Sequence, residues 1–201
     1  MIRPRPGAAF FIVACMLLAV AAAAGPLEDG AAAYEAGDYA RARTLWEPLA
    51  RQGDADAQFN LALLYMNGKG VEKNDRKALL LFLEAARQGH AEAQYNAGLL
   101  FYTGRGIARS TKDALLWWRR AADQGLAAAK YNLGIMYAYG EGVGVDNERA
   151  IALWREAAGD GYAEAMNALA VAYEKGWFGL PKDPARAKTW REKYRRARPG
   201  Q

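Results

Sequence analysis

Thiol and imidazole side chains are almost absent from this chain, whose 201 residues include one cysteine, Cys15, and one histidine, His90. A single cysteine cannot form a disulfide within the chain, and the two residues together supply neither an ordinary zinc site nor a nucleophile–histidine pair. The 22 Asp and Glu residues mostly have basic neighbours rather than isolated apolar surroundings. The composition therefore predicts a protein that is not an enzyme and that has no catalytic residues, no metal and no cofactor.

Long uncharged apolar stretches are also missing, except near residue 1. Arg3 and Arg5 precede an apolar run over residues 7–20, and small residues follow at 22–24. This order is typical of a secretory signal peptide with its cleavage site. We interpret residues 1–24 as a signal peptide and expect the rest of the chain in a bacterial periplasm. An uncleaved signal anchor is the alternative, and it would be the only contact with a membrane.

The formal net charge of +5 falls to +3 if Arg3 and Arg5 leave with the signal peptide. Much of the remaining positive charge lies over residues 186–198, which hold seven Lys and Arg residues against Glu192 alone. We interpret this segment as a solvated last helix whose basic residues complement the helix dipole. Contact with anionic lipid or nucleic acid is the alternative.

A repeat of 36 residues organises the rest of the chain, and the same glycine marks each copy: Gly53, Gly89, Gly125 and Gly161. Repeats of this length are helical units that bury their apolar faces only by stacking on a neighbour. The opening unit, 26–53, has a short Gly37-Asp38 turn and is predicted to be a capping hairpin of tetratricopeptide type. The other predicted units are three repeats over 54–89, 90–125 and 126–161, and a divergent C-terminal repeat with a basic tail over 162–201.

Each repeat predicts two helices joined by a glycine-rich loop. First helices are expected over 55–66, 91–102 and 127–138, ending at Gly68, Gly104, Gly140 and, in the last repeat, Gly176. The G-x-G loops are interpreted as structural turns in which an aliphatic residue fills an apolar seam: Val71, Ile107 and Val143. Second helices are expected to begin after a capping residue: Asn74, Ser110, Asp146 and Asp183.

Small and aromatic residues within these helices predict how they pack. Gly98 and Gly134 lie inside first helices, where glycine costs up to about 1 kcal/mol relative to alanine. We therefore expect the partner helix to cross closely at both positions. Trp46, Trp118 and Trp154 are expected to fill the core between helices.

The first three full repeats follow the pattern A-x-A-x-Y-N-L-G-x-x-Y-x-x-G-x-G-V, then a capped helix with A-x-x-W/Y-x-x-x-A-A-x-x-G. In this they resemble Sel1-like repeats, and the resemblance extends from Gly30 to Arg196, with a looser last block in which Ala168 replaces the asparagine. It implies an all-α fold, a right-handed α-solenoid of stacked helix-turn-helix repeats. It also implies an adaptor role, often in bacterial envelope or signalling assemblies. A cysteine-rich branch of the family is linked to β-lactams, but this chain lacks the paired cysteines of that branch.

Tetratricopeptide arrays, to which this family is related, bind peptides on a concave surface lined by first helices. By that analogy, the candidate partner-binding residues are Tyr95, Asn96, Tyr102, Tyr131, Asn132 and Tyr139. Aromatic side chains are strong anchors for peptides, and side-chain amides both donate and accept hydrogen bonds. The alternative for the asparagines is a hydrogen bond to the neighbouring repeat.

These observations favour a periplasmic adaptor that binds a protein or peptide partner on its concave face, and not a nucleic acid. Two alternatives remain open. A secreted envelope hydrolase, using carboxylates on β-lactams or peptidoglycan, would need a carboxyl group with a strongly raised pKa in the groove. An RNA-binding repeat protein would need the chain to stay in the cytoplasm.

Overall fold

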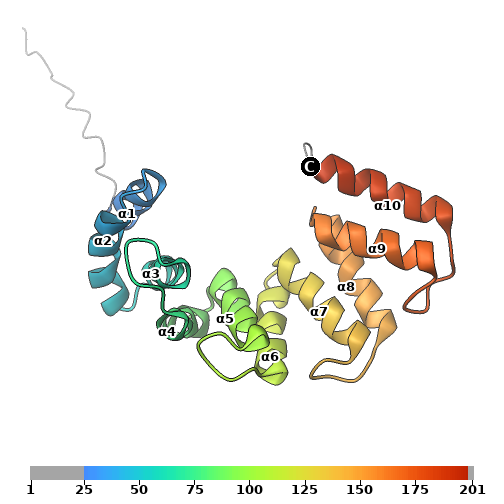
Figure 1. The fold of residues 1–201 in the computed structure, drawn as a ribbon, viewed down its shortest axis with the longest axis horizontal. Coiled ribbons are helices and arrows are strands. Elements are labelled where there is room, and N and C mark those ends of the chain that lie inside the picture. Colours follow the sequence, from blue (N-terminus) through green and yellow to red (C-terminus); the bar gives the residue numbers. More distant parts are fainter. Residues whose placement is uncertain (1–24, 199–201) are drawn as a thin grey trace, which may run out of the picture.

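The computed structural model describes residues 25–198, which form ten α-helices and no β-strand. The helices are α1 (Pro26–Glu35), α2 (Tyr39–Arg51), α3 (Ala55–Asn67), α4 (Asp75–Arg87), α5 (Ala91–Thr103), α6 (Thr111–Asp123), α7 (Ala127–Tyr139), α8 (Asn147–Gly159), α9 (Ala163–Lys175) and α10 (Pro184–Ala197). Figure 1 shows them following one another as hairpins along an arc, with α1 and α10 at opposite ends. The predicted all-α solenoid is confirmed. The predicted signal peptide lies outside the described residues.

Local sequence sets the helix boundaries. The four predicted capping residues do cap the second helices, because each side chain accepts a hydrogen bond from the backbone N–H three residues further on: Asn74, Ser110, Asp146 and Asp183. The first helices end at glycines in the left-handed conformation, with φ between 68° and 71°: Gly68, Gly104, Gly140 and Gly176. In the three predicted cases, each first helix extends one residue beyond the predicted end.

A glycine facing a tryptophan brings the two helices of a hairpin close together. A Cβ atom added at Gly98 would lie 2.6 Å from Cδ1 of Trp118. One added at Gly134 would lie 2.3 Å from Nε1 of Trp154. Both tryptophans are buried, so the indole ring occupies the space that a side chain on the facing helix would need. The predicted close crossing is confirmed at both positions.

Buried glutamines connect successive hairpins in the N-terminal half of the array. The Gln58 amide donates to the carbonyl oxygen of Ala50, in the preceding hairpin, at 3.2 Å. Its own oxygen accepts from Gln88 at 2.8 Å. Gln94 and Gln124 repeat this pair one hairpin later, also at 2.8 Å. Because a buried amide without partners is costly, the bond to Ala50 fixes how one hairpin sits on the next, and the glutamine pairs join the two helices of a single hairpin.

An ion pair replaces the glutamine pair in the next hairpin. Lys130 stands where Gln94 stands one repeat earlier, and its Nζ lies 2.8 Å from a carboxylate oxygen of Asp160. Hydrogen bonding to Asp160 raises the pKa of Lys130, so the ammonium stays charged. The two helices of a hairpin are therefore joined by neutral amides in α3–α4 and α5–α6 and by an ion pair in α7–α8.

The second glycine of the G-x-G loop lies against the preceding hairpin. A Cβ atom at Gly106 would lie 2.5 Å from the backbone nitrogen of Arg76, at the start of α4. Beside it, the Arg105 guanidinium donates to both carboxylate oxygens of Asp75, at 3.0 and 2.7 Å. The loop, which the sequence predicted only as a turn, is thus also a contact between hairpins.

The loop valines and isoleucine differ in burial. Val71 and Val143 are half-buried against the core, as predicted. Ile107 is 43% exposed, so the prediction that it fills an apolar seam is wrong. Ile107 instead lies at the surface of α4, where it lines a shallow hollow with Leu80, itself 56% exposed, and Leu83. Within residues 25–198, no helix has the length and apolar character needed to cross a bilayer.

Candidate protein-binding face

Tyr95 on α5 and Tyr131 on α7 occupy equivalent positions one repeat apart, and both side chains are half-buried. Trp118 and Trp154 hold their backbones in place. The indole N–H of Trp118 donates to the carbonyl oxygen of Tyr95 at 3.0 Å, and that of Trp154 to the carbonyl oxygen of Tyr131 at 3.1 Å. Because these bonds join the two helices of a hairpin, both tyrosines stand on rigid supports.

Tyr162 belongs with these two residues, although the sequence did not point to it. It is the N-cap residue of α9, makes no capping hydrogen bond, and its ring centroid lies 5.4 Å from that of Tyr131. An aromatic residue at a position that favours Ser, Thr, Asp or Asn is the signal that sequence reasoning missed. We call Tyr95, Tyr131 and Tyr162 the tyrosine cluster.

The environment keeps all three phenols of the tyrosine cluster neutral. Burial, with the nearby phenols and the Glu164 carboxylate, raises the pKa of Tyr162 to about 12, against an opposing effect of Arg198. Burial is also the main reason why the pKa values of Tyr95 and Tyr131 are raised, and Glu164 contributes to both. Neutral phenols both donate and accept hydrogen bonds. The cluster therefore offers aromatic surface and hydrogen-bonding capacity on three successive hairpins.

The two predicted asparagines have different surroundings. The Asn132 side chain lowers the pKa of the Tyr95 phenol in the preceding repeat, and so partly offsets the increase that burial causes. The Asn96 amide donates to the carbonyl oxygen of Glu92, one turn earlier on α5, at 2.8 Å. Contact between repeats, the alternative interpretation, thus fits Asn132 but not Asn96. Their role in partner binding stays a prediction.

Tyr102 and Tyr139 lie in the last turns of α5 and α7, beside the loops. The Arg109 guanidinium lies 5.2 Å from the centroid of the Tyr102 ring. The Glu141 carboxylate, together with burial, raises the pKa of Tyr102, while Arg109 opposes this effect. Tyr139 is 62% exposed, and its ring meets that of Phe178 edge-on at 5.7 Å between centroids. Of the six predicted residues, Tyr95 and Tyr131 belong to the tyrosine cluster, Asn96 and Asn132 directly follow them on the same helices, and Tyr102 and Tyr139 lie at the loop ends.

His90 has a structural position at the start of α5. Its Nδ1 accepts a hydrogen bond from the backbone N–H of Ala93 at 3.2 Å, and its ring stacks on Phe59 with centroids 4.5 Å apart. Nε2 lies 3.2 Å from a carboxylate oxygen of Asp56, and only 13% of the imidazole side chain is exposed. The histidine therefore caps a helix and packs between repeats.

The acidic residues show no arrangement for metal binding, since no group of three or more His, Cys, Asp or Glu side chains within residues 25–198 could hold an ion. Hydrogen bonds from Arg105 and Arg191 lower the pKa values of the Asp75 and Glu174 carboxyl groups, respectively. A carboxylic acid that donates a proton near neutral pH needs the opposite shift. Neither of these two groups is suited to the hydrolase alternative.

Comparison with known proteins gives one family. The Sel1 repeat family matches five successive segments of the chain: 13–54, 55–90, 91–126, 127–162 and 163–193. The first segment begins before the described residues and includes the α1–α2 hairpin. No curated protein matches the chain.

Solved structures of Sel1 repeat proteins resemble the array. A Sel1 repeat protein from Oxalobacter formigenes is 34% identical with a TM-score of 0.76, over 85% of this chain and 70% of that one. The protein c5321, a protective antigen of uropathogenic Escherichia coli, is 30% identical with a TM-score of 0.79. That match covers 86% of this chain but only 38% of the antigen. A Klebsiella pneumoniae Sel1 repeat protein, 22% identical with a TM-score of 0.59, shares the fold over 77% of this chain and 73% of its own.

Proposed function

The chain belongs to the Sel1 repeat family, whose members generally mediate protein–protein interactions, and we propose that it is a periplasmic adaptor that binds its partner along the first helices. The family is typically a non-catalytic scaffold, and the adaptor proposed here performs no chemistry on its partner. It holds a segment of another protein on the concave face, and the solenoid supplies a long surface for that contact.

The tyrosine cluster is the observation that carries this proposal. Its three phenols come from three successive hairpins, stay neutral, and are half-buried rather than fully packed away. Aromatic anchors contribute more binding energy than most side chains, and a rigid support lowers the entropy cost of binding. The hydrogen bonds from Trp118 and Trp154 to the cluster backbone provide that support.

The chemistry of this face favours a peptide segment with apolar side chains. Leu99 and Ile135 lie one turn beyond Tyr95 and Tyr131 and are also half-buried, so aliphatic surface continues from the aromatic rings. The phenol hydroxyls and the side-chain amide of Asn132 are available to peptide backbone groups. An extended or helical segment would therefore gain both apolar contact and hydrogen bonds.

Site-specific photo-crosslinking tests the binding face. A photoreactive phenylalanine analogue is placed at Tyr139, which is 62% exposed on the first helix α7, in cells that produce the protein. The matched control is Leu116, which is 46% exposed on the second helix α6. We expect a discrete adduct at Tyr139 and none at Leu116, and mass spectrometry of the adduct identifies the partner. Equal labelling at both positions, or labelling at Leu116 alone, would contradict a first-helix binding face.

Export is tested separately with residues 1–40 fused to alkaline phosphatase, which is active only outside the cytoplasm. The proposal expects phosphatase activity, and it expects a variant with Asp in place of Val13 to lose it because a charge interrupts the apolar run. Activity of both fusions or of neither would rule out a signal peptide over residues 1–24. The size of the secreted fusion distinguishes a cleaved signal peptide from an anchor.

A further inference from the structure

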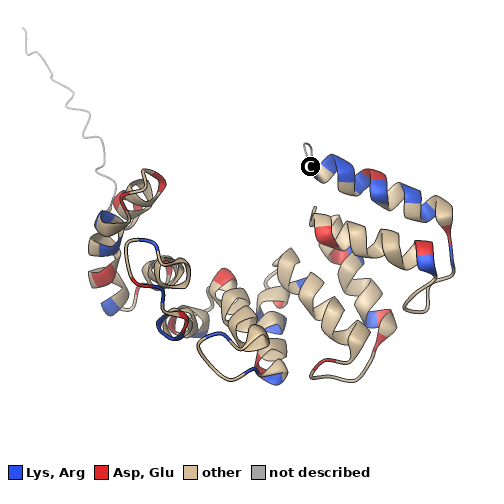
Figure 2. Cartoon of the chain, in the orientation of Figure 1, with Lys and Arg blue, Asp and Glu red and all other residues tan. Residues whose placement is uncertain are grey.

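Positive charge gathers in the C-terminal half of the array. Figure 2 shows Lys and Arg residues along α10, and the second helices α6 and α8 add Arg119, Arg149 and Arg155. Two of these arginines, Arg119 and Arg149, line one groove. The groove is separate from the binding face proposed above, which contains neither residue.

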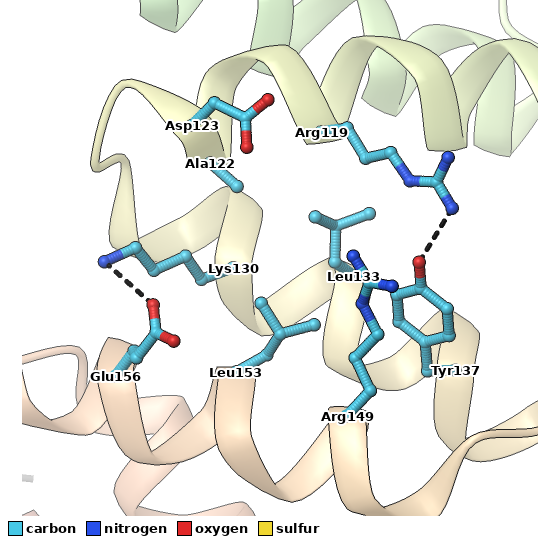
Figure 3. A pocket seen from close by; sticks show the side chains of 9 residues that line it. All are labelled: Arg119, Ala122, Asp123, Lys130, Leu133, Tyr137, Arg149, Leu153 and Glu156. Atoms are coloured by element: carbon cyan, nitrogen blue, oxygen red, sulfur yellow. Dashed lines mark hydrogen bonds and ion pairs between the residues drawn. The ribbon is translucent and has the colours of Figure 1, made fainter.

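The groove has a volume of about 400 Å³ and is lined by residues of α6, α7 and α8. Leu133 from α7 and Leu153 from α8 supply apolar surface in its middle, as Figure 3 shows. At one end, Lys130 pairs with Glu156 at 3.5 Å and with Asp160 at 2.8 Å. Asp123 lines the same end, so the positive charge of Lys130 is more than neutralised within the protein.

Two arginines meet at a tyrosine at the other end of the groove. Arg119 donates from Nη2 to the hydroxyl of Tyr137 at 2.7 Å, and the Arg149 guanidinium carbon lies 4.7 Å from the centroid of the same ring. Figure 3 shows both guanidinium groups directed toward Tyr137. Tyr137 itself is 3% exposed, so the arginines are held by a buried and immobile ring.

The charges of Arg119 and Arg149 are not compensated by the described part of the chain. No carboxylate of residues 25–198 lies within 4.0 Å of either guanidinium group. A guanidinium has five N–H donors, and Arg119 uses one of them on Tyr137. Paired guanidinium groups with free donors are suited to a carboxylate, which accepts two parallel hydrogen bonds.

The arginines and tyrosine of this groove have a counterpart between α8 and α10, where Arg155 donates to the hydroxyl of Tyr173 at 3.0 Å and the Arg186 guanidinium carbon lies 5.6 Å from the ring centroid. There, however, Arg186 pairs with Asp183 at 3.3 Å, so its charge is compensated.

The other two junctions differ more. Between α2 and α4, Glu47 stands at the position of Arg119, so the equivalent hollow begins with a negative charge. Between α4 and α6, the position of Leu153 is taken by Trp117, which is 7% exposed and fills the space. Among these four junctions, only the groove between α6 and α8 joins two uncompensated arginines to a half-buried leucine, Leu153.

We propose that this groove binds an acidic segment of a partner protein. A carboxylate of the segment enters between Arg119 and Arg149, and an adjacent apolar side chain contacts Leu133 and Leu153. Charge complementarity selects the carboxylate, and the concave shape favours an inserted side chain over a flat surface. The neutralised Lys130–Glu156 end offers no attraction for a uniformly anionic surface, so the geometry favours an acidic peptide over a membrane.

A labelled synthetic peptide of alternating leucine and glutamate tests the proposal by fluorescence anisotropy with the purified protein. The control peptide carries glutamine in place of glutamate. We expect the glutamate peptide to bind and R119Q/R149Q to weaken it about ten-fold or more, because two charge-assisted contacts are lost. The matched control R87Q/K112Q removes the same charge from exposed second-helix positions outside the groove and should change binding less than about two-fold.

A second variant keeps both arginines and fills the groove. Leu153→Trp copies the residue that the preceding repeat carries at the same position, Trp117, so it is compatible with the fold. It too should weaken the glutamate peptide about ten-fold. The helical circular dichroism signal of each variant shows whether it is folded. If R119Q/R149Q is unfolded, the proposal is judged on Leu153→Trp alone.

Several results would overturn the acidic-segment proposal. One is equal binding of both peptides, and another is equal loss in R119Q/R149Q and R87Q/K112Q, which would mean general charge attraction. Binding to vesicles containing phosphatidylglycerol with no binding of the glutamate peptide would assign the arginines to a lipid surface instead. None of these outcomes bears on the crosslink at Tyr139, because neither Tyr139 nor any residue of the tyrosine cluster lines the groove.

Discussion

Pairs of facing residues set how closely the two helices of a hairpin pack. Gly98 faces Trp118 and Gly134 faces Trp154, whereas Ala62 stands at the same position in the repeat where Phe82 replaces tryptophan. The extra methyl group of alanine and the smaller ring of phenylalanine offset each other. Side-chain size at the two positions is therefore linked, because a close-packed interior has no room for a change on one side alone.

Gly134→Ala should destabilise the protein by about 1–3 kcal/mol, because its Cβ would meet the Trp154 ring. Gly134→Ala combined with Trp154→Phe should be more stable than Gly134→Ala alone, since it recreates a pair that the chain already contains. Urea unfolding measures both. Gly159→Ala is the control: nothing lies within 4 Å of its Cβ position on α8, so it should be neutral or stabilise by up to about 1 kcal/mol. Similar losses at both glycines would show that contact with tryptophan is not the cause.

Tyr162 should make stability depend on pH in the alkaline range. Its pKa is raised from 10.0 to about 12 in the folded protein, so the native state keeps the proton after the unfolded chain has lost it. The contribution is complete below pH 10 and disappears as pH rises toward 12. In urea unfolding between about pH 9 and pH 11, Tyr162→Phe should lose less stability with rising pH than the parent protein. The same slope in both would remove Tyr162 as the cause.

At the scale of helices, one side chain caps the N-terminus of each second helix of the four full repeats. Asp146 accepts from the backbone N–H of Arg149 at 2.9 Å and is exposed, so its replacement leaves the core untouched. Asp146→Ala should cost about 1 kcal/mol, and Asp146→Asn should cost much less because the amide oxygen still caps. Thermal unfolding measures both. An equal loss in the two variants would point to charge at the helix N-terminus rather than to the capping bond.

Helix caps and helix-ending glycines could be predicted from the sequence, whereas contacts between repeats could not. The caps and the left-handed glycines depend on residues a few positions apart, so their pattern is visible in each copy. The contact of Gly106 with α4 and the bond from the buried Gln58 amide to Ala50 depend on how hairpins are rotated against each other. Tyr162 was missed for the same reason, since its partner Tyr131 lies in another repeat.

At the scale of the whole molecule, the regular period makes hairpins removable as units. Deleting residues 90–125 joins Gly89 to Leu126 and removes one hairpin without changing the register of the others. The shortened chain should keep its helical signal per residue, and its urea m-value should fall by about a fifth because one of five hairpins is gone. Circular dichroism during urea unfolding measures both. Deleting residues 90–107, half a repeat, is the control and should abolish cooperative unfolding.

The polar bond that joins the two helices of a hairpin is not the same in every copy of the repeat. Salt does not screen the Gln58–Gln88 and Gln94–Gln124 bonds, because amides carry no net charge. The link between Lys130 and Asp160 is electrostatic, so added salt weakens it. Rising ionic strength should therefore weaken the α7–α8 hairpin more than the α3–α4 and α5–α6 hairpins. In a protein built from near-copies of one unit, the salt concentration of the surroundings would then decide how firmly that one hairpin is closed.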